Sequence, residues 1–412
     1  MSSVLNTRVP LFVSENVSEI VVTWSTWNET IYSIVEYGID KFSHSAHGES
    51  KLFVDGGPEK RKQFIHRVRL TNLLPRQKYV YHCGSEFGWS EQYWFFTADS
   101  TVNWSPKLAV FGDMGNINAR SLPYLQEEAQ KHMYDAILHV GDLAYDMRDE
   151  NGQVGDQFMR QIAPVAGYVP YMVCPGNHEE AFNFSHYRER FSMPGPHENL
   201  MYSFNLGPVH FISINTEAYY FVEYGLKLLV LQHMWLEKDL QEANLPKNRA
   251  ERPWIITYGH RPMYCSDDDG DDCTRYSSRV RVGLPIFHWF GLEKLFYKYG
   301  VDLEIWAHEH SYERLWPVYN HEIKNGSYKE PYRNPKAPVH IISGSAGCQE
   351  NTDPFIKNPQ PWSAFRSSDY GYARLQIFNA SHLYMEQVSV NKKGKVIDNM
   401  WLIKDKHGPY EE

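Results

Sequence analysis

The sequence has no apolar run as long as the roughly 18 residues that a membrane-spanning helix needs, so no membrane span is predicted. Basic residues are not in excess: 41 Lys and Arg face 50 Asp and Glu, for a formal net charge of −9. That balance argues against a nucleic-acid-binding surface. Residues 1–8 lack a charged head followed by an apolar core, so no signal peptide is visible. Internal repeats are absent too, and the only biased segment is the acidic run 267–272.

Cysteine is scarce, with five in the chain, and an odd number leaves at least one thiol unpaired. Cys265 and Cys273 flank the acidic run and could close it as a disulfide, but spacing alone leaves this open. Potential N-glycan acceptors, each an Asn-x-Ser/Thr sequon, begin at Asn16, Asn28, Asn103, Asn183, Asn325 and Asn379. The sequons favour a secreted, extracellular or lumenal protein, and the oligomeric state is not readable from the sequence.

At 412 residues the chain exceeds one typical domain, and two are expected. Residues 1–98 are predicted to form an all-β sandwich, because short β-branched and aromatic runs alternate with turn signals. The expected strands are residues 19–27, 33–38, 64–70, 78–84 and 91–98. Residues 99–106 are a predicted linker.

From residue 107 to about 402, buried strands alternate with helical patterns, which predicts an α/β domain with a layered sandwich of mixed sheets and flanking helices. The expected helices are residues 121–133, 156–166, 226–243 and 288–299. Beyond residue 310 the sequence becomes rich in strands, which indicates a β-rich C-terminal part.

Five short motifs each follow an apolar run that is typical of a strand buried on both faces. They are Gly-Asp-Met-Gly (112–115), Gly-Asp-Leu-Ala-Tyr (141–145), Gly-Asn-His-Glu (176–179), Tyr-Gly-His (258–260) and Ala-His-Glu-His (307–310). Ligands of open α/β sheets bind at the carboxyl ends of strands, so we expect the polar residues of these motifs to meet along one sheet edge. Carboxylate, amide, phenol and imidazole groups together supply the mixed ligands of a two-metal site.

The ordered motifs resemble those of the purple acid phosphatases, within the metallophosphoesterase superfamily, over residues of about 10 to 400. Residues 259–266 and 310–317 resemble most closely the animal acid phosphatase type 7 group of that family. The resemblance implies a metallophosphoesterase fold preceded by a fibronectin type III-like domain. It also implies hydrolysis of phosphate monoesters by a metal-activated hydroxide.

The resemblance also implies residue roles. Asp113, Tyr145 and His310 would hold Fe(III), and Asp142 would bridge it to a second divalent metal (Zn, Fe(II) or Mn). That second metal would be completed by Asn177, His260 and His308. His178 would contact the phosphate or protonate the leaving oxygen, a general-acid role that suits imidazole.

One departure concerns substrate binding. Plant members carry a histidine pair nine and ten residues after the His260 equivalent, where this chain has Asp269 and Gly270. Carboxylates near the site would repel a phosphate dianion. They could instead favour an electropositive substrate, bind an extra cation, or lie in solvent.

Other readings of the same residues remain. Arg261 and Arg314 are expected to pair with carboxylates rather than contact phosphate, and Glu309 is expected to lie behind the ligands or in solvent. A di-metal phosphodiesterase or nucleotide hydrolase would use the same metal ligands. From a different class, a secreted non-catalytic metal- or phosphate-binding protein would keep the fold without turnover.

Overall fold

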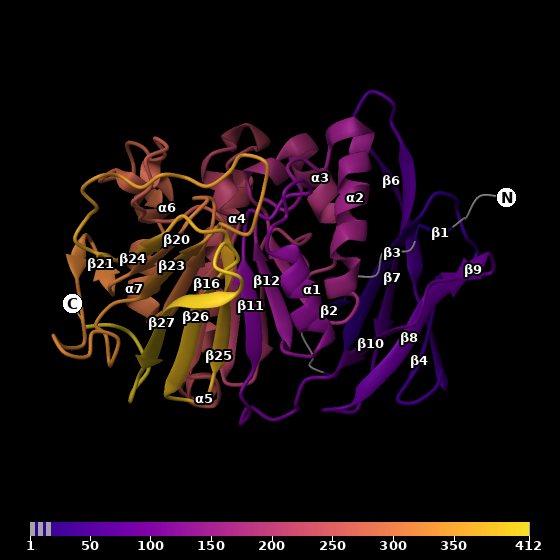
Figure 1. Cartoon of the computed structure of the whole chain (residues 1–412), viewed down its shortest axis with the longest axis horizontal. Coiled ribbons are helices and arrows are strands. Elements are labelled where there is room, and N and C mark those ends of the chain that lie inside the picture. The colour runs from indigo at the N-terminus through magenta and orange to yellow at the C-terminus, as the bar shows by residue number, and fades with distance from the viewer. Residues whose placement is uncertain (1–4, 7–10, 14–17, 412) are drawn as a thin grey trace.

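The computed structural model describes residues 5–6, 11–13 and 18–411, so the Asn16 sequon lies outside the described residues. At its N-terminal end the chain forms two five-stranded sheets, which confirms the all-β prediction (Figure 1). The first contains β1 (Leu5–Asn6), β3 (Ile20–Thr26), β7 (Lys62–Leu70) and β6 (Glu49–Val54) in that order, with β2 (Leu11–Val13) also paired to β3. The second contains β10 (Tyr93–Phe96), β8 (Lys78–Ser85), β4 (Ile34–Gly38) and β5 (His44–His47), with β9 (Gly88–Trp89) paired to β8.

Residues 99–106 contain no helix or strand, and two larger sheets follow. The six-stranded sheet is ordered β13 (Tyr171–Cys174), β12 (Ala136–Val140), β11 (Lys107–Phe111), β25 (Gly371–Ile377), β26 (His382–Ser389), β27 (Lys395–Ile403). The seven-stranded sheet is ordered β14 (Tyr202–Leu206), β15 (Val209–Ser213), β16 (Trp254–Tyr258), β19 (Leu303–Trp306), β23 (Val339–Ser343), β20 (Tyr312–Leu315), β24 (Ser363–Ser367). Both sheets mix parallel and antiparallel pairs: β11 is parallel to β12 and antiparallel to β25.

The two larger sheets pack face to face, and the sequence of each strand shows why. Successive side chains of a strand point to opposite faces, so a strand covered on both sides is apolar throughout. In β16, Ile256 belongs to the core between the sheets, whereas its neighbour Ile255 joins the core beneath the helices on the outer face. The central strands β12, β16 and β19 are therefore buried on both faces, whereas the edge strand β27 alternates between exposed and buried residues, and the arrangement confirms the predicted layered sandwich.

Helices cover the outer faces (Figure 1). They are α1 (Leu122–Gln130), α2 (Asp149–Ala166), α3 (Ala181–Arg190), α4 (Lys227–Ala243) and α7 (Glu293–Tyr299), with the shorter α5 (Pro246–Glu251) and α6 (Arg279–Val282). Leu125 of α1 and Phe158 of α2 pack into the core of the six-stranded sheet, and Leu236 of α4 and Phe296 of α7 pack on the seven-stranded sheet. Among the described residues, none of these helices is both long and apolar enough to cross a membrane.

Two expectations need correction. The helix expected over residues 288–299 begins only at Glu293, because the short strand β18 (Trp289–Phe290) pairs with β17 (Gly283–Leu284) just before it. The five ligand-bearing strands also do not share one sheet: β11, β12 and β13 lie in one sheet and β16 and β19 in the other. A continuous apolar run shows that a strand is buried, but it does not show which sheet the strand joins.

The N-terminal sheets dock on the helices of the larger sandwich through buried polar contacts. The carboxylate of Asp156 on α2 accepts hydrogen bonds from Arg61 (2.6 Å) and Gln63 (2.7 Å) of the N-terminal part, and from Arg190 (2.9 Å) of α3. Asp156 and Arg190 are 2% and 3% exposed, so these charges are compensated almost entirely by one another. Asp156 therefore links the N-terminal sandwich, α2 and α3.

We expect Asp156→Ala to lower the free energy of unfolding by about 3–5 kcal/mol, because it leaves the buried guanidinium groups without their carboxylate. Urea denaturation followed by circular dichroism measures the change. The control is Asp149→Ala on the same helix, whose exposed carboxylate lies 3.7 Å from Arg148, and it should change stability by less than about 0.5 kcal/mol. Equal effects of the two substitutions would contradict the role given to Asp156.

Candidate metal centre

Glycine residues allow the loops at the carboxyl ends of strands from the two larger sheets to lie close together. Gly141 has a φ of +81°, and a Cβ added there would lie 2.4 Å from Nδ1 of His260. A Cβ on Gly112 would lie 2.4 Å from that of Ala307 on the opposite sheet. The motif glycines thus permit contact between loops that come from different sheets.

One group of donors surrounds Tyr145. Its hydroxyl lies 3.0 Å from Oδ1 of Asp113 and 2.7 Å from Nε2 of His310. Asp113 is fully buried, and its other oxygen accepts a hydrogen bond from the backbone N–H of His308. A carboxylate, a phenol and an imidazole therefore converge on one point.

The second group surrounds His260. Its Nε2 lies 3.1 Å from Oδ2 of Asp142, 3.2 Å from Oδ1 of Asn177 and 3.1 Å from Nδ1 of His308. Asp142, His260 and His308 place one ligand atom each within 4.8 Å of one another. All seven of the expected metal-ligating residues thus fall into two adjoining groups.

Hydrogen bonds at the far ring nitrogens fix the histidine orientations. His260 Nδ1 lies 3.0 Å from the carbonyl oxygen of Val140, and His310 Nδ1 lies 2.9 Å from that of Asn351. A nitrogen facing a carbonyl must carry the proton, which leaves Nε2 of both rings as a lone-pair donor. In His308 the two ring nitrogens exchange these positions: Nε2 contacts the carboxylate of Asp271, and Nδ1 faces the second group.

The buried site shifts the pKa values of its acids in opposite directions. Burial raises the pKa of Asp142, but the imidazoles of His260 and His178 outweigh it and hold this pKa well below its usual range. Burial, with the carboxylates of Asp113 and Asp142, raises the pKa of Tyr145 well above its usual range. The phenol would therefore ionise only when a strongly Lewis-acidic cation coordinates its oxygen and a base takes the proton.

His178 lies beside both groups. Its backbone N–H donates to Oδ1 of Asp142 (2.9 Å), its Nδ1 lies 3.0 Å from Asp146, and its ring packs 4.2 Å from that of Tyr145. Burial lowers the pKa of His178, but the carboxylates of Asp142 and Asp146 outweigh it and raise this pKa to about 10. The side chain is 19% exposed, and its Nε2 lies 3.9 Å from Oδ2 of Asp142 and 3.8 Å from Oε1 of Glu350.

Two carboxylates that the sequence analysis did not single out organise this site. Glu179 accepts hydrogen bonds from the backbone N–H groups of Asp142 (2.9 Å), Leu143 (3.0 Å) and Gly176 (2.9 Å), and so ties two ligand loops together. Asp146 orients His178, as described above. Both residues lie within or next to the recognised motifs, but nothing in their spacing shows which partners they contact.

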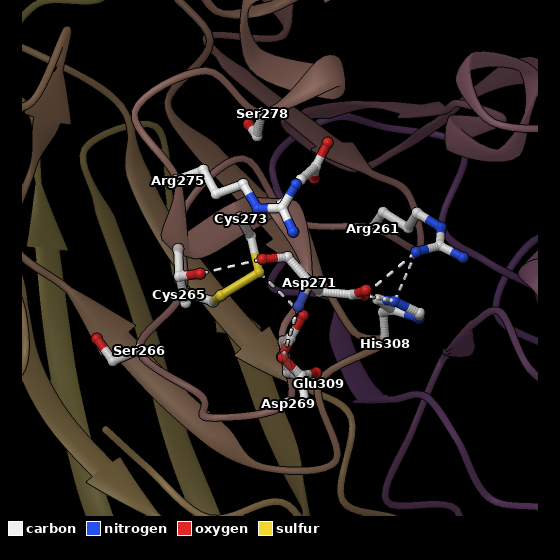
Figure 2. Close-up of a disulfide and its surroundings, with 12 residues drawn as sticks. Arg261, Cys265, Ser266, Asp269, Asp271, Cys273, Arg275, Ser278, His308 and Glu309 are labelled. Carbon is white, nitrogen blue, oxygen red and sulfur yellow. Dashed lines mark hydrogen bonds and ion pairs between the residues drawn. A yellow bond between two sulfur atoms is a disulfide. The ribbon is translucent and has the colours of Figure 1, made fainter. Parts of the chain in front are cut away.

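The acidic run lies next to the site, in a loop closed by a disulfide between Cys265 and Cys273 (Figure 2). In this loop it is Asp271, rather than Asp269 or Gly270, that contacts His308 and Arg261. The loop is only partly solvated, because Asp267 is fully buried. Burial, together with the carboxylates of Glu313 and Asp353, raises the pKa of Asp267 to about 8.

The arginines near the site have carboxylate partners, as expected. Arg261 pairs with Glu217 (2.9 Å) and Asp271 (3.2 Å), and Arg314 pairs with Asp398 (2.7 Å). Glu309 is fully buried behind the histidines, so the alternative of a solvent position is wrong.

Comparison with known proteins covers most of the chain. Residues 106–312 match the calcineurin-like phosphoesterase family, residues 337–399 the iron/zinc purple acid phosphatase-like protein C family, and residues 7–97 the purple acid phosphatase N-terminal domain. Acid phosphatase type 7 of Danio rerio is 60% identical over 95% of this chain and 90% of its own length. The chain belongs to the purple acid phosphatase family.

Further relatives agree. Acid phosphatase type 7 of Homo sapiens is 55% identical over 94% of this chain and 89% of its own length. The structure of purple acid phosphatase PPD1 from yellow lupin (Lupinus luteus) seeds has a TM-score of 0.80 and 25% identity, covering 97% of this chain and 74% of that one. These findings confirm the family and the fold that the five motifs predict.

Proposed function

We propose that this purple acid phosphatase is a metal-dependent acid phosphatase that hydrolyses phosphate monoesters at a binuclear centre. The observation that carries the proposal is the convergence of seven donors in two adjoining groups, with the buried carboxylate of Asp142 close to both. Asp142 lies 3.1 Å from His260 in one group, and its loop contacts the other group where the backbone N–H of Asp113 donates to the carbonyl oxygen of Gly141 (3.2 Å).

We assign Asp113, Tyr145 and His310 to a ferric ion. Asn177, His260 and His308 then hold a divalent ion (Zn, Fe(II) or Mn), and Asp142 bridges the two. Tyr145 supports the ferric assignment, because its buried hydroxyl needs a strong Lewis acid to become a phenolate. The second group, with two imidazoles and an amide oxygen, suits a borderline divalent cation.

When bound, the two cations supply a low-pKa water and neutralise the phosphoryl oxygens. The chain's own contribution is to place a proton donor beside them. His178 is held at Nδ1 by Asp146, and its Nε2 lies on the side of the bridging candidate Asp142, 3.9 Å from Oδ2. We assign His178 the contact with the phosphate and the protonation of the leaving oxygen. The acidic loop offers no imidazole for this role, which makes His178 the more important.

Compartment and domain limits are further proposals. We propose a sandwich domain related to fibronectin type III (residues 1–98), a linker (99–106) and a catalytic domain (107–402); the lack of regular structure in 99–106 supports this division. The disulfide supports an extracellular or lumenal location, where such bonds persist. Asn28, Asn103, Asn183 and Asn379 are exposed and suit N-glycans.

Purified protein should contain two metal ions and hydrolyse p-nitrophenyl phosphate best at a pH within the range of about 4 to 8. Metal analysis and a pH series measure this. Faster hydrolysis of bis(p-nitrophenyl) phosphate than of the monoester would favour a phosphodiesterase. Two bound metals without any phosphoester hydrolysis would leave a binding protein and overturn the enzyme proposal.

Tyr145→Phe should abolish the visible charge-transfer band, because it removes the phenolate from the ferric ion. The absorption spectrum of the metal-loaded protein measures this. The control is Tyr171→Phe, whose buried hydroxyl contacts His139 outside the two groups, and it should keep the band. An unchanged spectrum in Tyr145→Phe would refute phenolate ligation.

His178→Ala should keep both metals and lower kcat by about 10²–10⁴-fold, because it removes the general acid. The loss should be greater for an alkyl phosphate than for p-nitrophenyl phosphate, whose leaving group needs no proton. The exposed His44 on β5 provides the control, since His44→Ala should leave kcat unchanged. Equal losses on both substrates would rule out proton donation.

A further inference from the structure

A second group of acidic side chains lies beside the metal centre but shares none of its ligands. Asp269, Glu309 and Asp353 each place one carboxylate oxygen within 4.8 Å of the others. They come from three segments: the disulfide loop, the turn between β19 and β20, and the loop that precedes β24. Figure 2 shows Asp269 and Glu309 next to each other beside the disulfide, while Asp271 of the same loop points to His308.

Glu309 has no hydrogen-bond donor, although it is fully buried. Its Oε2 has no partner within the described structure. Its Oε1 lies 3.0 Å from Sγ of Cys273, but a sulfur in a disulfide carries no hydrogen to donate. A buried carboxylate without donors is strongly disfavoured unless something else compensates it. Asp267, also fully buried, has no partner for either of its oxygens.

The backbone holds the group in place. The disulfide closes the loop that carries Asp269, and two backbone hydrogen bonds attach this loop to the segment of Asp353: Asp268 N–H to Pro354 O (2.8 Å) and Ile356 N–H to Ser266 O (2.9 Å). Asp353 uses Oδ2 to accept from His310 N–H, and Asp269 uses Oδ1 to accept from Asp271 N–H. Each also presents a carboxylate oxygen to Glu309.

We propose that Asp269, Glu309 and Asp353 bind a third cation, Ca²⁺, separate from the binuclear centre. The available donors are oxygens only, because the nearby cysteines are joined in a disulfide, and such donors select hard cations. Asp269 is exposed, so water can fill the remaining positions of the six to eight that Ca²⁺ takes. Mg²⁺ fits less well, since it requires near-octahedral geometry and binds through one or two carboxylates.

The site gives a role to the acidic run in place of the plant histidine pair. Bound Ca²⁺ neutralises part of the negative charge beside the phosphate-binding centre. It also joins the disulfide loop to Glu309, which lies between the two histidines of the His-Glu-His motif.

The test is ⁴⁵Ca²⁺ equilibrium binding to the full chain loaded with its transition metals. Wild type should bind one Ca²⁺, with a Kd of about 10⁻⁴–10⁻³ M, as expected for a partly exposed carboxylate site. Asp269→Asn should weaken binding about tenfold or more while keeping the turn, because Asn can accept the same backbone hydrogen bond. The matched control is Asp268→Asn, an exposed neighbour outside the group, which should change Kd less than about twofold.

Two further experiments distinguish this Ca²⁺ site from the binuclear centre. Asp142→Asn, which removes the proposed bridge, should still bind Ca²⁺, and Mg²⁺ at the same concentration should compete poorly. The readout is binding rather than turnover, so failure of the phosphatase proposal leaves it interpretable. No binding up to about 10 mM Ca²⁺, loss of binding in Asp142→Asn, or equal effects of the two loop substitutions would each overturn the proposal.

Discussion

The structure depends on placing two fully buried carboxylates, Asp113 and Asp142, where two sheets meet. Isolated charges of this kind are strongly disfavoured in a protein interior, so everything around them supplies compensation. Imidazoles of His260 and His310 approach them, and backbone N–H groups of His178 and His308 donate to them. The two cations proposed for this site would complete that compensation, and their positive charge would also attract a phosphate. Folding and catalysis would therefore both require positive charge at this site.

The sequence predicted that the seven proposed metal ligands lie together, because each of them follows a strand whose apolar run is easy to recognise. β11, β12, β13, β16 and β19 all appear directly before, or reach into, the five motifs, as expected. Their distribution over two sheets could not be predicted, since burial on both faces looks the same in either sheet. The start of α7 was also misplaced, because the apolar side chains of β18 continue the helical pattern.

The surroundings of the ligands were harder to predict, for a physical reason. Glu179 acts through three backbone N–H groups, and backbone donors leave no trace in residue identity. Asp271 contacts His308 from a loop that a disulfide closes. The motif comparison points instead to Asp269 and Gly270, which stand where plant members carry histidines. Side chains that bind a metal recur in short motifs, whereas the residues that orient them depend on long-range contacts. This is why substrate preference is less readable than metal binding.

The N-terminal sandwich contacts two helices of the larger sandwich, one of which lies next to the proposed metal ligands. Arg61 and Gln63 reach Asp156, and Arg67 of β7 donates to the backbone of Glu189 in α3, which directly follows η1 (Asn177–Glu179). The sandwich thus supports the segment that carries Asn177 and His178. A shortened isoform or proteolytic fragment that began at the linker would lose this support, even though every ligand remained in its sequence. Substitutions in the sandwich that break these contacts would therefore act on the site from a distance, without changing any of the proposed ligands.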